Sequence, residues 1–335
     1  MGSPVPLWLG TASANERVVQ RMQGSVAGIP LAQGANATPR RRAKKDWKAG
    51  LWALLFLGPN LVLFGLFTAY PVVYGLYLSF FDYNILTPAE YVGLQNYQDF
   101  FRDPLSGKLI RNTVYFTVGA VIPSIVLPLI IAVLLNNAGL TKLWRGLYFL
   151  PLVTSGVAAA AVWKWLYAKD FGLINFGMRK IGLAPIDWLF NLDWAMPAII
   201  VMMVWLLLPF NIILFTAGLQ EIPREYYEAA QIDGASPLRQ FLGITVPLIT
   251  PTTFFVMLTT MLGVLFGGFD TIAVMTQGGP LNSTNILIYD IYQNAFQYFR
   301  MGYASALAWV LMAVIAVVTA LHFVLSKYWV FYGDD

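Results

Sequence analysis

Six long runs of apolar residues dominate this sequence of 335 residues. A helix needs about 20 mostly apolar residues to cross the roughly 30 Å of hydrocarbon in a bilayer. Since hydrocarbon offers no hydrogen-bond partner to an open backbone, runs of this length are expected to be helical. The predicted fold class is therefore all-α, a polytopic membrane protein with six transmembrane helices. The predicted spans are residues 51–78, 114–135, 147–166, 195–219, 244–266 and 304–328.

The composition fits a membrane protein and excludes several kinds of site. Charged residues make up 11% of the chain, whereas about a quarter of a soluble domain is charged. The sequence has no cysteine and a single histidine, His322, so it cannot build disulfides, the usual metal sites or a Ser-His-Asp triad. We expect no catalytic residue and no metal site. His322 is interpreted as packed between helices or lying at a helix end, with a proton relay as the alternative.

The first 46 residues differ from the rest of the chain. Residues 1–39 are rich in Gly, Ala, Pro and Ser without apolar periodicity, which is typical of disorder. A basic cluster between Arg40 and Lys48 then precedes the first span. Such a cluster is typical of the cytoplasmic flank of a first transmembrane helix and can contact anionic lipid, whereas a nucleic-acid partner is not expected. The expected organisation is a disordered, basic cytoplasmic tail at 1–46 and a six-helix membrane domain at 47–332.

The distribution of Lys and Arg predicts the orientation of the spans. With the N-terminus inside, the inner flanks carry eleven basic residues from Arg40 onward and the outer flanks carry seven. The excess on the cytoplasmic side follows the positive-inside rule. Both termini are therefore expected in the cytoplasm, as is the polar loop at 219–243.

That loop has the signals of two short helices. Pro223 suits the first position of a helix, and Gly234 suits a left-handed residue that ends it. Ser236 can cap a second helix that begins with Pro237. The loop is therefore predicted to form a helix–turn–helix along the membrane surface.

The loop is also more apolar than one that contacts only water. The small residues Ala229 and Ala230 lie beside the charged Glu228. Small side chains allow close approach, and a carboxylate at the rim of a contact suits a basic partner. Residue types alone leave two interpretations open: the loop docks into another protein, or it packs against its own helices.

The same stretch resembles the EAA loop of bacterial ABC importer permeases. Glu228–Ala229–Ala230, Gly234, Ile244 and Pro247 stand at the spacings of that pattern, and Val246 replaces its leucine. The resemblance implies a type I ABC importer transmembrane domain, in which this loop is a coupling helix held in a groove of the cytoplasmic ATPase. Glu228, Ala229, Ala230, Asp233 and Gly234 are the residues it implies for ATPase coupling.

Other stretches narrow the resemblance to the carbohydrate-uptake class, similar to the first permease of maltose or glycerol-phosphate importers. They are Tyr70–Pro71, Phe149–Leu150–Pro151 and Thr276–Gln277–Gly278–Gly279–Pro280. This resemblance implies a bacterial inner-membrane subunit that is not an enzyme and binds no cofactor itself. The sequence agrees in lacking a phosphate-binding G-x-x-x-x-G-K-[ST] motif. The implied partners are a second homologous permease, two ATPase subunits that bind ATP and Mg²⁺, and an extracytoplasmic solute-binding protein.

The substrate pathway is less clearly marked. The resemblance implies sugar contacts in spans three to five, where Trp205 could stack on a sugar ring and Thr154 and Asn211 could donate hydrogen bonds. Gly268 and Asp270 could line the pathway near the outer end of the fifth span. Each of these residues can equally be a packing residue. Two other functions stay open. One is a secondary transporter or channel, although the spans carry few of the embedded charges that an ion path needs. The other is a scaffold that docks an ATPase without transporting a solute.

Overall fold

The computed structural model describes residues 47–138 and 150–331, so the predicted tail at 1–46 lies outside the described residues. The chain divides into two units, Met1–Gly65 and Leu66–Asp335. In the described residues, five helices are long and apolar enough to cross a membrane, and a sixth apolar helix is shorter. The all-α, six-span prediction is confirmed, with the short helix as the third span.

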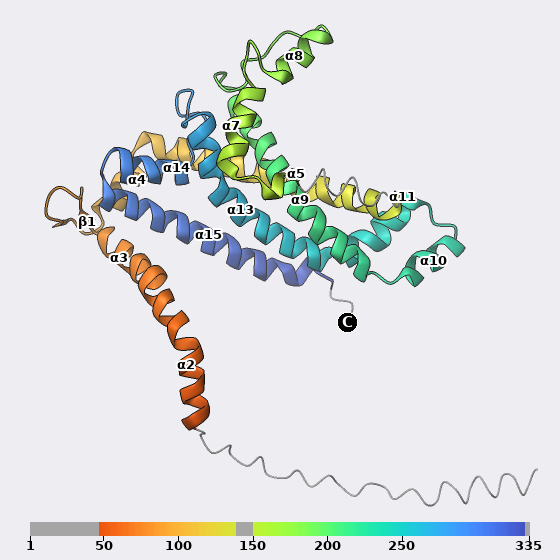
Figure 1. Ribbon diagram of the computed structural model, residues 1–335, viewed down its shortest axis with the longest axis horizontal. Helices are drawn as coiled ribbons and strands as arrows, with labels where there is room; N and C mark the ends of the chain where they lie inside the picture. Colours follow the sequence, from red (N-terminus) through yellow and green to blue (C-terminus); the bar gives the residue numbers. More distant parts are fainter. Residues whose placement is uncertain (1–46, 139–149, 332–335) are drawn as a thin grey trace, which may run out of the picture. The chain divides into compact units, whose positions relative to one another are not determined.

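The elements follow one another almost entirely as helices (Figure 1). The first half contains α2 (Trp47–Phe64), η1 (Gly65–Ala69), α3 (Tyr70–Leu78), β1 (Phe81–Asp82), β2 (Glu90–Tyr91), α4 (Gln95–Arg102), α5 (Pro104–Ala138), η2 (Leu150–Val153), α7 (Gly156–Leu166) and α8 (Leu173–Lys180). The second half contains α9 (Ala195–Glu221), α10 (Arg224–Ile232), α11 (Pro237–Gln240), η3 (Phe241–Thr245), α12 (Val246–Leu248), α13 (Thr250–Met275), α14 (Leu287–Tyr292), η4 (Gln293–Gln297) and α15 (Met301–Trp329). Strands β1 and β2 form a small antiparallel ribbon that the sequence analysis did not predict.

Two predicted spans have different bounds in the structure. The third was expected at 147–166, but its α-helix begins only at Gly156, because Pro151 lies in a 3₁₀ turn and Ser155 is extended; residues 147–149 lie outside the described residues. The fifth was expected at 244–266, whereas the continuous helix α13 runs from Thr250 to Met275. Helix α13 starts later than expected because a π turn and a break in the helix come before residue 250. It ends later because apolar residues continue the helix after Asp270.

Prolines explain two of the π-helical turns in the described residues, one inside the first span and one before the fifth. The π turn η1 comes directly before Tyr70–Pro71, and the π turn η3 comes directly before Val246–Pro247. A proline has no N–H for the carbonyl four residues earlier, and its ring clashes with that carbonyl. A wider turn relieves this conflict without ending the helix.

Helix α9 is the centre of the bundle in the second unit. Half of its most apolar window is buried, a larger share than in any other candidate span among the described residues. Helix α5 packs along α9, and α13 packs against α5, α7 and α9. The core between them includes Phe116, Met203 and Ile272, each almost fully buried. Helices α10 and α11 lie at one end of this bundle, and α4 and α14 lie at the other (Figure 1).

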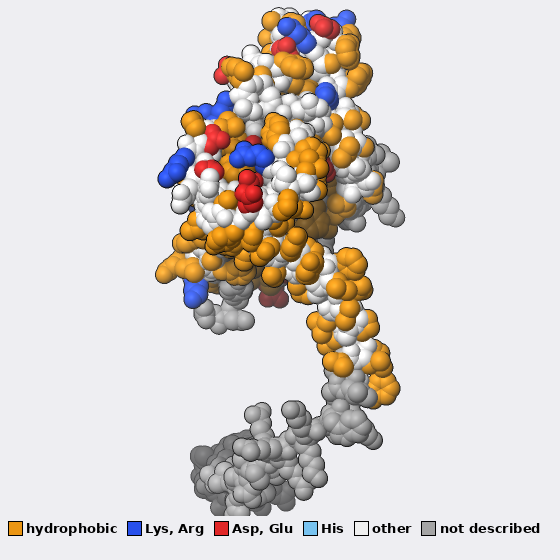
Figure 2. All heavy atoms as spheres, turned by 90° about the vertical axis from the view of Figure 1, so that its left-hand side faces the viewer, with side chains coloured by type: hydrophobic (Ala, Val, Ile, Leu, Met, Phe, Trp, Pro, Cys, Tyr) orange, Lys and Arg blue, Asp and Glu red, His pale blue; other side chains and the backbone are white. Residues whose placement is uncertain are grey.

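The surface of the helices is largely apolar, as a membrane requires. On the face shown in Figure 2, hydrophobic side chains cover much of the surface, while charged side chains gather at the top and in the middle. In the most apolar 18 residues of the Leu54–Leu78 segment none is buried, whereas Leu78 at the end of α3 is.

One buried amide joins the three central helices. Pro128 lies inside α5 and cannot donate a hydrogen bond to the carbonyl of Ser124, four residues before it. The Nδ2 of Asn211, on α9, donates to this carbonyl oxygen at 2.6 Å and to Thr260 Oγ1 on α13 at 2.9 Å. Asn211 is 1% exposed, so its amide replaces water as the partner of a carbonyl that a proline has left free.

We expect Asn211→Ala to destabilise the bundle, because it leaves the Ser124 carbonyl without a donor in an apolar environment. Loss of a partner for a buried polar group costs about 1–3 kcal/mol. Thermal unfolding of the purified protein in detergent measures the effect. Thr216→Val is the control, since the Thr216 hydroxyl bonds only to Ile212 of its own helix. Equal melting temperatures for the two variants would contradict the cross-linking role of Asn211.

Candidate functional site

The predicted helix–turn–helix is present in the loop at 219–243. Helix α10 covers the segment expected from the sequence, although Pro223 is its N-cap residue rather than its first helical residue. Gly234 follows with a φ angle of +74°, the left-handed conformation predicted for it. Ser236 caps α11 by accepting a hydrogen bond from the backbone N–H of Arg239, with Pro237 in the first turn. The local signals therefore predicted this loop correctly.

Helix α10 has two different faces. Arg224, Tyr227 and Gln231 line a cavity between the loop and the membrane helices, and their spacing places them on one side of the helix. Glu228 follows Tyr227 and Ile232 follows Gln231, so these two residues lie on a different side of the helix, and both are exposed. The side chain of Ile232 is 87% exposed, which is unusual for an isoleucine and marks an outward contact surface.

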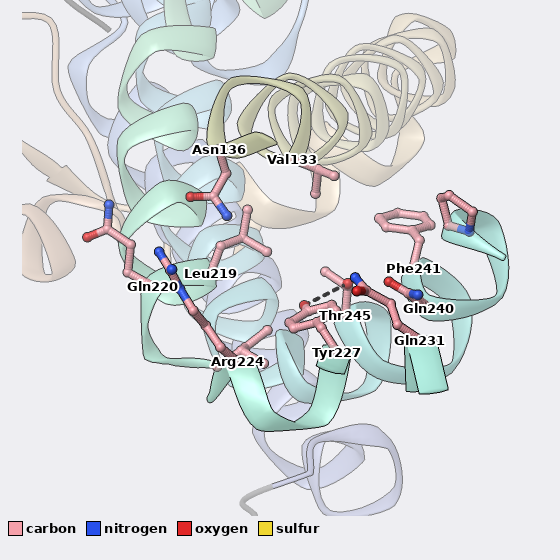
Figure 3. A pocket seen from close by; sticks show the side chains of 12 residues that line it. Val133, Asn136, Leu219, Gln220, Arg224, Tyr227, Gln231, Gln240, Phe241 and Thr245 are labelled. Atoms are coloured by element: carbon pink, nitrogen blue, oxygen red, sulfur yellow. Dashed lines mark hydrogen bonds between the residues drawn. The ribbon is translucent and has the colours of Figure 1, made fainter. Parts of the chain in front are cut away.

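A hydrogen bond connects α10 to the start of the fifth span. The Tyr227 hydroxyl lies 2.9 Å from Thr245 Oγ1, and Thr245 is buried at the end of the π turn η3 (Figure 3). Tyr227 also packs against a buried cluster that includes Phe215 of α9 and Ile249. The loop is thus attached to the bundle through both a polar and an apolar contact. This answers part of the question left open by the sequence: one face of the loop packs on its own helices, and the other face is free.

The cavity behind α10 has a volume of about 480 Å³ (Figure 3). It lies between the C-terminal ends of α5 and α9 and the segment that contains α10, α11 and η3. Four amide side chains line it, from Asn136, Gln220, Gln231 and Gln240, and Arg224 is the one charged residue among the described residues around it.

Two of the five predicted pathway residues are fully buried between helices. Asn211 is held by the hydrogen bonds to α5 and α13 given above. Gly268 lies where a side chain would not fit, because a Cβ atom there would be 2.6 Å from Cε1 of Phe116 and 3.0 Å from Cδ1 of Ile286. Gly268 therefore lies at a close approach of helices that only a glycine permits.

The other three pathway residues lie near α7. The rings of Trp205 and Trp163 meet edge to face at 5.6 Å, and Thr154 is half-buried in the turn before α7. Asp270 lies within α13 rather than after its end, and its Oδ2 is 3.3 Å from the position a Cβ of Gly156 would take. Gly156 is the first residue of α7, so Asp270 lies beside the N-terminus of that helix. These residues are distant in sequence from the coupling loop and belong to other elements.

A buried polar cluster on α14 was missed by the sequence analysis. Asp290 is 7% exposed and accepts hydrogen bonds from Nδ2 of Asn285 at 3.2 Å and of Asn294 at 3.0 Å. Burial raises the pKa of the Asp290 carboxyl, and the hydrogen bond from Asn285 acts in the opposite direction. Asp290 and Asn294 are four residues apart, one helical turn, and this spacing in the sequence could have indicated the cluster.

The comparisons with known proteins identify the family. The family described as "Binding-protein-dependent transport system inner membrane component" matches residues 106–329. The chain belongs to this family. It is therefore an inner-membrane permease component of a transport system, and not an enzyme.

Relatives match along nearly the full length of the permease. The probable ABC transporter permease protein YesP of Bacillus subtilis is 35% identical over 306 residues, which cover 89% of this chain and 97% of YesP. The sulfoquinovosyl glycerol transport system permease protein SmoG of Agrobacterium fabrum is 34% identical over 85% of this chain and 93% of SmoG. A chain in the crystal structure of a bacterial ABC transporter that imports the acidic polysaccharide alginate has the same fold, with a TM-score of 0.74, 23% identity, and coverage of 85% of this chain and 99% of that chain.

We expect Gly234→Ala to strain the turn after α10, because a residue with a Cβ atom is disfavoured in the left-handed conformation by roughly 1–2 kcal/mol. The space around Gly234 is open, so this cost comes from the backbone alone. Gly243→Ala is a matched control in the same loop, since that position is equally open and has no positive φ. Limited proteolysis within the loop compares the two variants. Equal cleavage rates would contradict a strained turn at Gly234.

Proposed function

We propose that this permease is the membrane subunit of an ATP-driven importer of a sugar or sugar-like solute. The observation that carries the proposal is near full-length similarity to permeases named for such solutes. SmoG is named for sulfoquinovosyl glycerol. The lactose transport system permease protein LacF of Rhizobium radiobacter is 33% identical over 87% of this chain. The arabinooligosaccharides transport system permease protein AraP of Bacillus subtilis is 32% identical over 81% of this chain.

The outward face of α10 and the residues that follow it are the proposed ATPase contact. Ile232, Leu238 and Leu242 are all large apolar side chains that are more than half exposed, and Glu228 is exposed one helical turn before Ile232. Apolar residues around a single carboxylate suit a protein partner with an apolar groove and a basic side chain. In this proposal, Ala229 and Ala230 allow close approach, while Asp233 and Gly234 form the turn that ends the docking helix.

The loop would transmit movement because it is attached to the spans on its other face. Tyr227 is bonded to Thr245, and this residue leads through η3 and α12 into α13. Helix α9 enters the loop from the opposite side. When the ATPase subunits close on ATP, the docked loop would move α9 and α13 together as rigid elements and switch the accessible side of the pathway.

The rest of the assembly follows from this role. A second homologous permease would complete the pathway, two cytoplasmic ATPase subunits would bind ATP and Mg²⁺, and an extracytoplasmic binding protein would deliver the solute. Both termini and the loop would face the cytoplasm, and lipid would cover the outer surfaces of the spans. Thr154, Trp205 and Asp270 are proposed to contact the solute, while Asn211 and Gly268 shape the helices around it.

We expect Glu228→Ala to reduce uptake strongly while leaving the fold intact, because the side chain is exposed and makes no hydrogen bond within the described residues. Uptake and binding-protein-stimulated ATP hydrolysis are measured in proteoliposomes that contain the whole complex. Glu221→Ala is the control, since Glu221 is also an exposed carboxylate but ends α9 before the docking helix begins. Normal uptake by the Glu228 variant would overturn the docking role of this residue.

A further inference from the structure

The cavity behind α10 has the size and lining of a small-molecule site. Its volume of about 480 Å³ lies in the range of about 300–1,000 Å³ that is usual for ligand pockets. Its lining takes Arg224, Tyr227 and Gln231 from α10 and does not include the exposed Glu228 and Ile232. An ATPase docked on Ile232 would therefore contact a different face of α10.

The side chains around the cavity have a particular chemistry. Asn136, Gln220 and Gln231 present amide groups that make no hydrogen bond within the described residues, and Gln240 retains a free Oε1 because only its Nε2 is bonded, to the carbonyl of Ala235. Each amide offers both a donor and an acceptor, as does a sugar hydroxyl. Such a lining suits a ligand with several hydroxyl groups.

The charge of the cavity indicates a second property of its ligand. The guanidinium of Arg224 is the one charged group among the described lining residues, and no acidic residue is among them. Arg224 makes no ion pair with any described residue. An unpaired guanidinium matches a phosphate group, which it can bind through two parallel hydrogen bonds.

We propose that this cavity binds a small phosphorylated sugar from the cytoplasm. Arg224 contacts the phosphate, the amides of Asn136, Gln231 and Gln240 contact the hydroxyl groups, and the Tyr227 ring forms part of the wall. The ligand touches the loop and the inner ends of α5 and α9 at once, so its binding free energy stabilises this position of the loop. If the proposed coupling role holds, the ligand slows transport as phosphorylated product accumulates.

The absence of cysteine from the sequence permits a direct binding test. Val133 lines the cavity without contributing a polar group, so Val133→Cys reports occupancy through its rate of reaction with a maleimide. Glu221→Cys is the control, because Glu221 is exposed, does not line the cavity and lies before the docking helix. Labelling of the purified complex is measured with glucose 6-phosphate, glucose or inorganic phosphate.

We expect glucose 6-phosphate to slow labelling at position 133 several-fold and to leave labelling at position 221 unchanged, with little effect of glucose or phosphate alone. Adding Arg224→Met should abolish this protection, whereas Arg239→Met, a basic residue in α11 that does not line the cavity, should preserve it. No protection would overturn the proposal. If inorganic phosphate protected as well as glucose 6-phosphate, the cavity would bind anions without recognising a sugar. If glucose protected equally well, Arg224 would have no role in binding a phosphate. Either result would contradict the proposal. Labelling reports binding even if the loop proves not to couple ATP hydrolysis to uptake.

Discussion

The buried amide of Asn211 is the interaction on which the arrangement of the central helices depends. Pro128 leaves a backbone carbonyl of α5 without its donor, in surroundings where water cannot replace it. Asn211 supplies the donor from α9 and reaches Thr260 of α13 with the same group. A local defect in one helix therefore fixes its alignment with two others. Because α9 and α13 are also the helices on either side of the loop at 219–243, in the proposed mechanism this alignment would determine how a force on the loop reaches the bundle.

The loop combines a held face with a free face. Tyr227 and its neighbours attach one side of α10 to the bundle, while Glu228 and Ile232 on the other side are exposed. A helix with two free faces would rotate under load, and one with no free face could not receive a partner. The division explains why a short segment of nine residues can serve as a mechanical link in the proposed mechanism. It also separates the cavity behind α10 from the surface that the ATPase would occupy.

Much of this structure could be predicted from local signals in the sequence. The apolar runs predicted the six spans, and Pro223, Gly234, Ser236 and Pro237 predicted the shape of the loop, because turn and cap preferences act over a few residues. Contacts between distant segments could not be predicted in this way. Neither the partner of the Ser124 carbonyl nor the approach of Phe116 to Gly268 has a signal within its own segment. For the same reason, the sequence suggested Asn211 as a candidate sugar ligand. In the structure, its hydrogen bonds join helices α5, α9 and α13. The start of α13 was misplaced because apolar content alone does not show where prolines interrupt a helix.

The central claim is that the loop acts as a stiff lever through its attachment to the fifth span. Tyr227→Phe tests it most directly, because this variant removes the hydroxyl that bonds to Thr245 and leaves the outward face of α10 unchanged. The measurement is the number of ATP molecules hydrolysed per solute molecule taken up by the reconstituted complex. The account predicts that the ATPase subunits stay bound and that this ratio rises, since hydrolysis continues while less movement reaches α13. An unchanged ratio with normal uptake would contradict it.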